Sequence, residues 1–521
     1  MSGGARPDLP RRVGELARRG AARFGDAPAL VEAARRLDYR ALACAVDDAA
    51  DALAGLGVGP GDRALIVNEN CAAALVLALA ATLRDAWPVL VNARLSRREV
   101  EAIRAHCSPR RLFFTSEVSV EAARHAAAVG AGPLPLPGVG TVAVGPRDDG
   151  AVPEPVPDDP SAQVAALIYT SGTMGAPKGV MLSHRNLLFA AMTGAGLRRL
   201  APGDRVYAAL PISHVFGLAS VSMSALLAGA ALHLVPRFTP EGLATALEDD
   251  GISILPGVPA MYARLLDYLR RTGRAAVAPR VRFLYAGGAP LDAQLKADVE
   301  ALFGQPLHNG YGLTETSPTV SQTRLDAPRA DLSIGPPVPG IEIRIVDAKG
   351  RAVAPGATGE LHVRGPNVML GYYCSPDLTA EALGPDGWLR TGDLARQDER
   401  GDLFIAGRSK ELIIRSGFNV YPIEVEGVLN QHPAVSQSAV VGRAVAGDEE
   451  VVAFVELRAG ASATADELRA FAAERLAPYK RPGEIVVLDA LPATATGKVL
   501  KSRLRELARG EANPGSPRPR G

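Results

Sequence analysis

The clearest group of residues able to do chemistry lies between positions 170 and 180, which read TSGTMGAPKGV. Backbone N–H groups in a glycine-rich turn can converge on an anion, because glycine allows close approach and unusual dihedrals. The apolar strand QVAALIYT at 163–170 leads into this turn, so we expect it to bind the phosphates of a nucleoside triphosphate. The donors offered are Thr170, Ser171, Gly172, Thr173 and Lys178.

The stretch does not match the common phosphate loop of NTPases. That loop requires Gly-Lys followed by Ser or Thr, whereas Lys178 lies between Pro177 and Gly179. The other Gly-Lys pair, at 497–498, is followed by Val499 and fails as well. Considered alone, residues 170–180 fit a Gly/Ser surface turn better than a phosphate site.

Further segments along the chain favour a specific interpretation. The pattern T-S-G-T-x-G-x-P-K-G resembles the signature of the adenylate-forming superfamily, which contains acyl- and aryl-CoA ligases, adenylation domains and beetle luciferases. Other pieces of that pattern follow in the same order and cover nearly the whole chain: ALPISHVFG (209–217), LYAGGAPL (284–291), NGYGLTETSP (309–318), GELHVRGPNVMLGYY (359–373), WLRTGDL (388–394), GRSKELIIRSGFNVYP (407–422) and LPATATGKVLK (491–501).

The resemblance implies a two-step reaction that uses ATP, Mg²⁺ and coenzyme A. A small-molecule carboxylic acid attacks the α-phosphate of ATP, which gives an acyl-adenylate and pyrophosphate. A thiol then attacks the acyl-adenylate and releases AMP. The first step needs a protein that positions two anions and stabilises the charge between them.

By resemblance, three residues act on the phosphates. Lys498 is the predicted catalytic lysine that bridges the carboxylate and the α-phosphate; the alternative is an exposed lysine beside a turn. Thr314 is expected to contact the α-phosphate, and Glu315 to coordinate Mg²⁺, which commonly needs one or two protein carboxylates. The alternative for Glu315 is an acid at a helix N-terminus.

Other residues are expected to hold the nucleoside. Tyr311 resembles the aromatic side chain that stacks on adenine, although it could instead be a core residue. Asp393 and Arg408 resemble the two contacts to the ribose hydroxyls, and a turn aspartate is the alternative for Asp393. The remaining ATP-binding candidates are Gly288, Ala289, Asn309, Gly310 and Gly312.

The acyl pocket is predicted around His214, which resembles a histidine at the mouth of that pocket. His214 is counted among the candidate catalytic residues, but a proton-transfer role does not follow from a lone histidine. The other pocket candidates are Val215, Val258, Gly288 and Asn309.

The C-terminal motifs predict a hinge and a coenzyme A contact. Lys410 matches the position about which the C-terminal domain turns between the two steps, where relatives often carry Asp. Gly417 and Asn419, in RSGFNVYPIEVE, are expected to meet the pantetheine arm of coenzyme A. This phrase most resembles the fatty-acyl-CoA ligase branch.

A medium- or long-chain fatty acid is therefore the first predicted substrate and an aryl acid of the coumarate or benzoate kind the second. The segment HVFGLAS after Pro211 holds no acid that could bind an α-amino group, which argues against an amino acid. A carrier-protein thiol stays open as the alternative acceptor, and monomer and homodimer both stay open.

The composition of the 521 residues is ordinary for a soluble globular protein. Lys plus Arg is 57 and Asp plus Glu is 56, so no nucleic acid or anionic membrane is expected as partner. The four cysteines are far apart, which fits a reducing compartment, and we expect no secretory signal in the charged N-terminal stretch. We expect a cytoplasmic location.

Alternation of apolar strands and Ala-rich helices predicts an α/β fold with largely parallel, buried strands. We expect a large N-terminal domain (1–407) of α/β subdomains with a small β-rich subdomain (about 328–407), then a small mobile α+β C-terminal domain (408–510) and a disordered tail (511–521). The uncharged run at 216–236 is expected to be a buried helix (Leu218 to Leu227), a turn at Gly229 and a buried strand, and no transmembrane segment is predicted.

Overall fold

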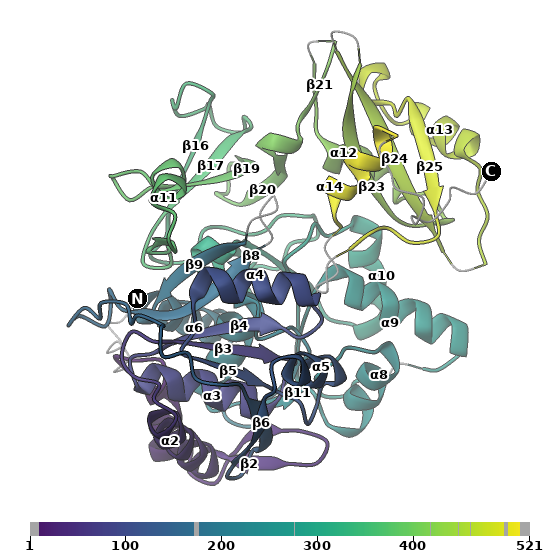
Figure 1. Ribbon diagram of the computed structural model, residues 1–521. Coiled ribbons are helices and arrows are strands. Elements are labelled where there is room, and N and C mark those ends of the chain that lie inside the picture. The colour runs from purple at the N-terminus through teal and green to yellow at the C-terminus, as the bar shows by residue number, and fades with distance from the viewer. Residues whose placement is uncertain are drawn as a thin grey trace.

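The computed structural model describes residues 10–170, 177–275, 277–416, 418–445, 448–458, 460–493 and 499–510. The described chain forms two large sheets, a small four-stranded sheet and a C-terminal unit with its own sheet (Figure 1). This arrangement confirms the predicted α/β class. Some predicted residues lie outside the described ranges: Ser171, Gly172, Thr173, Gly417, Lys498 and the tail at 511–521.

The first large sheet is parallel at its centre, where β3 pairs with β4 and β5, and β4 with β8. Its strands, in spatial order, are β18 (Gly371–Tyr372), β9 (Lys178–Ser183), β8 (Val164–Thr170), β4 (Trp87–Asn92), β3 (Arg63–Asn68), β5 (Arg111–Phe114), β7 (Gly140–Val144) and β6 (Gly132–Leu136). Helices cover both faces. Ile66 and Leu90 pack on the side of α3 (Ala72–Leu83), whereas Val67 and Val91 pack with α4 (Arg97–Cys107), so the central strands are buried on both faces.

The second large sheet is parallel from β14 to β1 and has an antiparallel strand at each edge. Its strands are β15 (Thr319–Gln322), β14 (Leu307–Gly312), β13 (Phe283–Ala286), β12 (Ile254–Gly257), β10 (Arg205–Ala208), β11 (Ala231–Leu234), β1 (Pro28–Val31) and β2 (Arg36–Asp38). Because β13 and β14 are parallel neighbours, the segment 287–289 lies beside 310–312 at the carboxyl ends of the strands. Ligands of α/β sheets bind at such ends.

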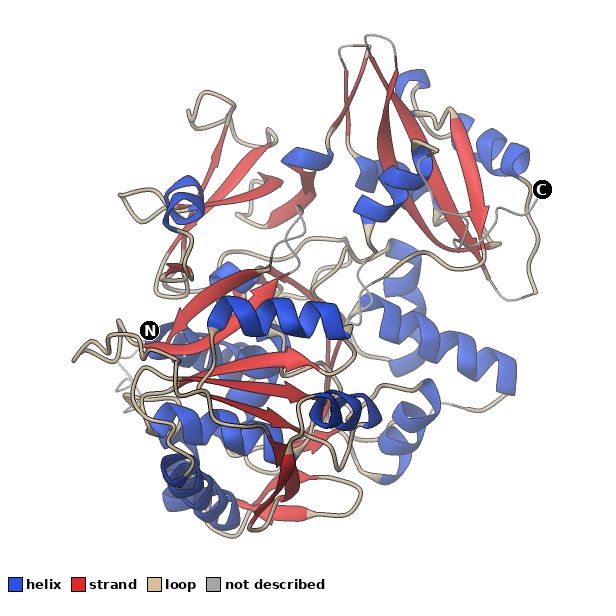
Figure 2. Ribbon diagram, in the orientation of Figure 1, coloured by secondary structure: helices blue, strands red, loops and turns tan. Residues whose placement is uncertain are grey.

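Helices surround both large sheets, as Figure 2 shows. Ser96 caps the start of α4, and its side chain accepts from the N–H of Glu99. The other helices of this part are α1 (Glu15–Phe24), α2 (Tyr39–Gly55), α5 (Val120–Ala128), α6 (His184–Leu197), α8 (Pro240–Asp249), α9 (Pro259–Thr272), α10 (Ala293–Phe303) and the short η2 (Thr314–Thr316).

The predicted helix after His214 is present, but its first half is a π-helix. It consists of η1 (Phe216–Met223), then α7 (Ser224–Ala228), with a turn at Gly229 before β11. The buried guanidinium of Arg198 donates to the carbonyl oxygen and the hydroxyl of Ser220, which satisfies groups that the wider turn frees. Among the helices of the described residues, none combines the length and apolar character needed to cross a bilayer.

A small antiparallel sheet follows, as the sequence predicted. It has the order β16 (Glu342–Val346), β17 (Gly359–Arg364), β19 (Leu389–Gln397) and β20 (Leu403–Arg408), and it encloses its own small core. The helix α11 (Pro376–Ala382) precedes β19. Pairing of β19 with β20 sets Asp393 opposite Arg408.

The C-terminal unit has hydrophobic clusters separate from those of the large sheets. It contains the sheet β23 (Val435–Val445), β24 (Asp448–Leu457) and β25 (Glu484–Leu488), the hairpin β21 (Ile413–Arg415) and β22 (Phe418–Val420), and the helices α12 (Pro422–Leu429), α13 (Ala465–Ala473) and α14 (Lys501–Ala508). The short turns η3 (Ser409–Glu411) and η4 (Pro478–Lys480) complete it. The exact domain bounds and the mobility of this unit stay predictions.

Candidate active site

A cleft of about 2420 Å³ gathers residues from the two large sheets, the small sheet and the C-terminal unit. The C-terminal unit contributes Glu426, Ser438 and Lys501, among others. Most of the predicted site residues that the structure describes line this one cleft: Thr170, Lys178, His214, Val258, Gly288, Ala289, Asn309, Gly310, Tyr311, Gly312, Thr314, Glu315, Asp393, Arg408 and Lys410.

The predicted nucleoside contacts form one connected group. The Tyr311 hydroxyl donates a 2.5 Å hydrogen bond to Oδ2 of Asp393, and Nε of Arg408 lies 3.1 Å from Oδ1 of the same carboxylate. Asp393 is 4% exposed. Burial, with the nearby Asp393 carboxylate, raises the pKa of Tyr311, so its phenol stays a neutral donor. Tyr311 and Arg408 thus fix the orientation of the Asp393 carboxylate, whose oxygens can accept hydrogen bonds from hydroxyl groups.

Close backbone packing explains why residue 312 of β14 is a glycine. A Cβ atom at Gly312 would lie 1.5 Å from the carbonyl oxygen of Pro318. Only glycine therefore lets β14 approach the chain just after η2, the turn that begins with Thr314, a residue that is 6% exposed. This packing holds Thr314 and Glu315 beside Tyr311.

Glu315 is linked to Lys178 through a tyrosine that the sequence did not single out. The hydroxyl of Tyr372 donates to Oε1 of Glu315 over 2.8 Å. The ammonium nitrogen of Lys178 lies 5.4 Å from the centroid of the Tyr372 ring. Burial raises the pKa of Tyr372, with the Glu315 carboxylate as a further cause, so the hydroxyl keeps its proton.

The chemistry of this group fits Mg²⁺. Glu315 offers a hard carboxylate oxygen beside a lysine suited to phosphate, and Mg²⁺ commonly takes its other ligands from substrate phosphates and water. Within the described ranges no cluster of three or more His, Cys, Asp or Glu side chains forms a closed metal site. Glu315 is therefore the residue that would hold the ion, and the ion would supply positive charge to the phosphates.

His214 lies where the chain enters η1, and its Nδ1 accepts a hydrogen bond from the N–H of Phe216 over 3.2 Å. Phe216 and Val258 flank Gly288: a Cβ atom at Gly288 would lie 3.8 Å from Cδ1 of Phe216 and 3.6 Å from Cγ1 of Val258. Because this part of the wall is aromatic and aliphatic, it suits the apolar part of a substrate.

Val215 was predicted to line the acyl pocket, and the structure places it elsewhere. Its side chain is fully buried in the main hydrophobic core, while His214 and Phe216 on either side line the cleft. Successive residues at the start of a helix point in different directions, which turns Val215 away from the cleft. Phe216 is the wall residue that the sequence reasoning missed.

The predicted hinge lies beside a buried lysine. Lys410 is in η3, and the ammonium group of Lys501 lies 3.2 Å from Oε2 of Glu411 and 2.8 Å from Oε1 of Glu426. Burial lowers the pKa of Lys501, but the two carboxylates outweigh this effect and raise it. Asn419, predicted to contact coenzyme A, is exposed on β22.

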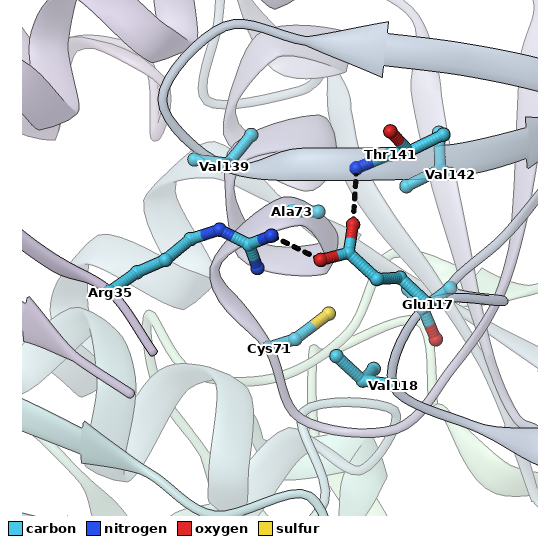
Figure 3. A pocket seen from close by; sticks show the side chains of 9 residues that line it. Arg35, Cys71, Ala73, Glu117, Val118, Val139, Thr141 and Val142 are labelled. Carbon is cyan, nitrogen blue, oxygen red and sulfur yellow. Dashed lines mark hydrogen bonds and ion pairs between the residues drawn. The ribbon is translucent and has the colours of Figure 1, made fainter. Parts of the chain in front are cut away.

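A second cavity is too small to be a substrate site (Figure 3). Its volume is about 10 Å³, which is room for about one water molecule. Arg35 forms an ion pair with Glu117, and Glu117 accepts from the N–H of Thr141 over 2.6 Å. Burial raises the pKa of the adjacent Cys71 thiol to about 12, so Cys71 is a packed thiol and not a nucleophile.

Comparison with known proteins shows which family this chain belongs to. The sequence matches a family model described as "AMP-binding enzyme" over residues 17–373 and one described as "AMP-binding enzyme C-terminal domain" over residues 424–498. An "Indoleacetate--CoA ligase" of Aromatoleum aromaticum is 36% identical over 481 residues, covering 91% of this chain and 93% of that protein. A "Long-chain-fatty-acid--CoA ligase" of Bacillus subtilis is 38% identical over 354 residues, covering 67% of this chain and 62% of that protein.

Solved structures give the same result. ATP-bound MatB from Rhodopseudomonas palustris has a TM-score of 0.83 at 31% identity, covering 96% of this chain and 100% of that one. The O-succinylbenzoate coenzyme A synthetase of Bacillus subtilis in complex with ATP and magnesium has a TM-score of 0.80 at 29% identity, covering 94% and 99%. The chain therefore belongs to the AMP-binding enzyme family, and it is an AMP-forming acid–thiol ligase that uses ATP, Mg²⁺ and coenzyme A with a carboxylic acid.

Proposed function

We propose that this ligase activates a carboxylic acid whose tail is neutral and apolar. A medium- or long-chain fatty acid is the first candidate. The observation that carries the proposal is the cleft wall around Gly288, formed by the side chains of Phe216 and Val258. Such a wall stabilises an apolar tail by removing it from water, at about 25 cal/mol per Å². A second carboxylate against these side chains would lose hydration without gaining a hydrogen-bond partner.

An aryl acid is the second candidate, and an aromatic contact favours it. The ring of Phe216 meets the ring of Tyr285 edge to face, with centroids 5.6 Å apart, and both residues line the cleft. An aromatic substrate could extend this arrangement. The indoleacetate ligase, whose own length the alignment covers to 93%, also supports this candidate.

In the proposed first step, Lys498 approaches the carboxylate and the α-phosphate and screens the repulsion between them. Thr314 contacts the α-phosphate, and Lys178 holds the pyrophosphate that departs. Glu315 holds Mg²⁺. Asp393 and Arg408 bind the ribose while Tyr311 packs on adenine. The nucleoside is thereby fixed, so that attack on the α-phosphate becomes effectively unimolecular.

In the proposed second step, the C-terminal unit turns about Lys410 and brings the segment with Gly417 and Asn419 to the cleft. The exposed position of Asn419 supports this step, because an exposed polar side chain is available to a new contact. The thiol of coenzyme A then attacks the acyl carbonyl and AMP leaves. A carrier-protein thiol is the alternative acceptor.

A panel of acids tests the substrate proposal. AMP release is measured with and without coenzyme A for decanoate, palmitate, 4-coumarate, indole-3-acetate and adipate. We expect the largest kcat/KM for one of the two fatty acids and the smallest for adipate, whose far end is charged. A preference for adipate, or AMP release that requires a carrier protein, would contradict the proposal.

The variant Phe216→Leu separates the two candidates, because it keeps an apolar wall but removes the aromatic edge. For an aryl acid we expect kcat/KM to fall about two- to tenfold, since aromatic pairs are worth about 0.5–1.5 kcal/mol beyond burial. For a fatty acid we expect little change. If kcat/KM for the aryl acids does not fall, the Phe216 ring is not the feature that favours them.

A further inference from the structure

Tyr372 lines the cleft and contacts two of the predicted phosphate-site side chains, Glu315 and Lys178. Its hydroxyl binds Oε1 of Glu315, and its ring lies beneath the ammonium group of Lys178. These two contacts use different parts of one side chain. A substitution can therefore remove the first and leave the second.

The backbone around Tyr372 fixes it between the same two elements. The two-residue strand β18 pairs with β9, with Tyr372 opposite Val180, and so adds to the edge of the sheet beside Lys178. On the other side, the N–H of Met369 donates to the carbonyl oxygen of Glu315 over 2.9 Å. The N–H of Tyr372 itself donates to Oγ1 of Thr379 over 2.9 Å. Tyr372 is thus held by main-chain contacts that do not depend on its hydroxyl.

We propose that Tyr372 is a positioning residue, which holds Glu315 in the orientation that binds the metal and holds Lys178 at the departing pyrophosphate. The hydrogen bond takes Oε1 of Glu315 and leaves Oε2 as the oxygen for the ion. Side chains that orient a ligating carboxylate commonly change metal affinity by about 10- to 100-fold when they are lost. The inference rests on the proposed role of Glu315.

The neighbouring residue provides a matched control. Tyr373 also donates to a glutamate, with its hydroxyl 2.6 Å from Oε1 of Glu154, but it packs in a hydrophobic cluster with Trp87 on the other side of the strand. Tyr372→Phe and Tyr373→Phe therefore remove the same chemical group from adjacent positions. Only the first change affects Glu315.

The experiment measures metal binding and not turnover. Mn²⁺ is titrated into the full-length protein with a non-hydrolysable ATP analogue, and free Mn²⁺ is followed by electron paramagnetic resonance. We expect Tyr372→Phe and Glu315→Gln each to raise the Kd of Mn²⁺ by about 10-fold or more, and Tyr373→Phe to leave it unchanged. The double variant Glu315→Gln, Tyr372→Phe should be no weaker than Glu315→Gln alone, because Tyr372 acts through Glu315.

The outcomes of this titration separate the metal-binding role of Glu315 from the positioning role of Tyr372. If Glu315→Gln weakens Mn²⁺ binding and Tyr372→Phe does not, or if the two effects add, Tyr372 does not act through Glu315 and the inference is wrong. If Glu315→Gln itself leaves the Kd unchanged, the proposed metal role of Glu315 fails, and the role of Tyr372 fails with it.

Tyr372→Leu tests the second contact. It removes the ring beneath Lys178, whereas Tyr372→Phe keeps it. Because a cation–π contact is worth about 0.5–1 kcal/mol at exposed sites, we expect the inhibition constant of pyrophosphate to rise about two- to fivefold for Tyr372→Leu relative to Tyr372→Phe. Equal inhibition constants in the two variants would contradict a role of the ring.

Discussion

Tyr311 and Asp393, which are far apart in the sequence, are joined by a hydrogen bond of 2.5 Å from the phenol to Oδ2. Arg408 approaches the other carboxylate oxygen on the opposite strand of the small sheet. The bond therefore ties β14 of the second large sheet to β19 of the small sheet. A ribose that binds Asp393 must therefore share the carboxylate with Tyr311 or displace the Tyr311 hydroxyl from it.

Asp393→Asn tests whether this carboxylate binds the ribose of ATP. Loss of a hydrogen bond to a charged group costs about 1.5–3 kcal/mol, so we expect the KM for ATP to rise by about 10- to 150-fold while kcat changes less. Discrimination between ATP and 3′-deoxy-ATP should shrink in the variant. Asp377→Asn, at an exposed position of α11, is the control. Undiminished discrimination in Asp393→Asn would argue against ribose binding there.

Lys410→Pro tests the predicted hinge. Proline fixes φ, so the variant should form acyl-adenylate at the normal rate and be slow to form the CoA thioester. Pyrophosphate exchange reports the first step, and thioester formation from supplied acyl-adenylate reports the second. Lys410→Ala removes the same charge without stiffening the chain, and should be normal in both assays. A normal thioester rate in Lys410→Pro would show that no turn about residue 410 is needed.

Two buried histidines predict an acid-sensitive fold. Burial lowers the pKa of His184 and of His308 to about 4 each. Because the unfolded chain titrates near about 6.5, it binds more protons than the folded chain between these values, and stability falls as pH falls. From pH 7 to pH 5, we expect each histidine to lower the free energy of unfolding by about 2 kcal/mol.

Urea unfolding at several pH values measures this effect. His184 accepts a hydrogen bond from the N–H of Val13 through Nδ1, which an asparagine oxygen can also do. His184→Asn should therefore fold and show a smaller loss of stability between pH 7 and pH 5. An identical pH dependence in the variant would mean that His184 does not contribute.

Much of the candidate site could be predicted because its residues lie in recognisable motifs, some of which, such as those with Thr170 and Tyr311, lie at the ends of strands. The motifs with Tyr311 and Asp393 contain the residues that the structure joins, and their order along the chain was enough to identify them. The capping box of Ser96 and Glu99 at the start of α4 is likewise a local pattern. Local hydrogen-bonding groups and ordered motifs carry this information in the sequence itself.

Other features depend on contacts between distant residues, which the sequence does not display. The π-helical turn at 216–223 is stabilised by Arg198, which lies just after the end of α6, and its apolar pattern looks the same as that of an α-helix. The prediction that Val215 lines the acyl pocket was wrong, because the start of the helix turns this side chain into the hydrophobic core. Tyr372 was missed because its partners, Glu315 and Lys178, lie far away in the sequence.

Lys498→Ala tests the residue predicted to join the two substrates in the first step. We expect adenylate formation to be abolished, because the cation proposed to bridge the carboxylate and the α-phosphate is then missing. Thioester formation from supplied acyl-adenylate should persist. Lys349→Ala, at an exposed turn, is the control for loss of a lysine charge. Equal loss of both activities in Lys498→Ala would contradict its assigned role.

Isotope transfer from the acid tests the central claim most directly. Decanoate labelled with ¹⁸O in both carboxylate oxygens is incubated with the protein, ATP, Mg²⁺ and coenzyme A, and the masses of AMP and pyrophosphate are measured. If the acid attacks the α-phosphate, AMP carries one ¹⁸O and pyrophosphate carries none. Unlabelled AMP formed together with decanoyl-CoA, or label in pyrophosphate, would contradict activation through an acyl-adenylate.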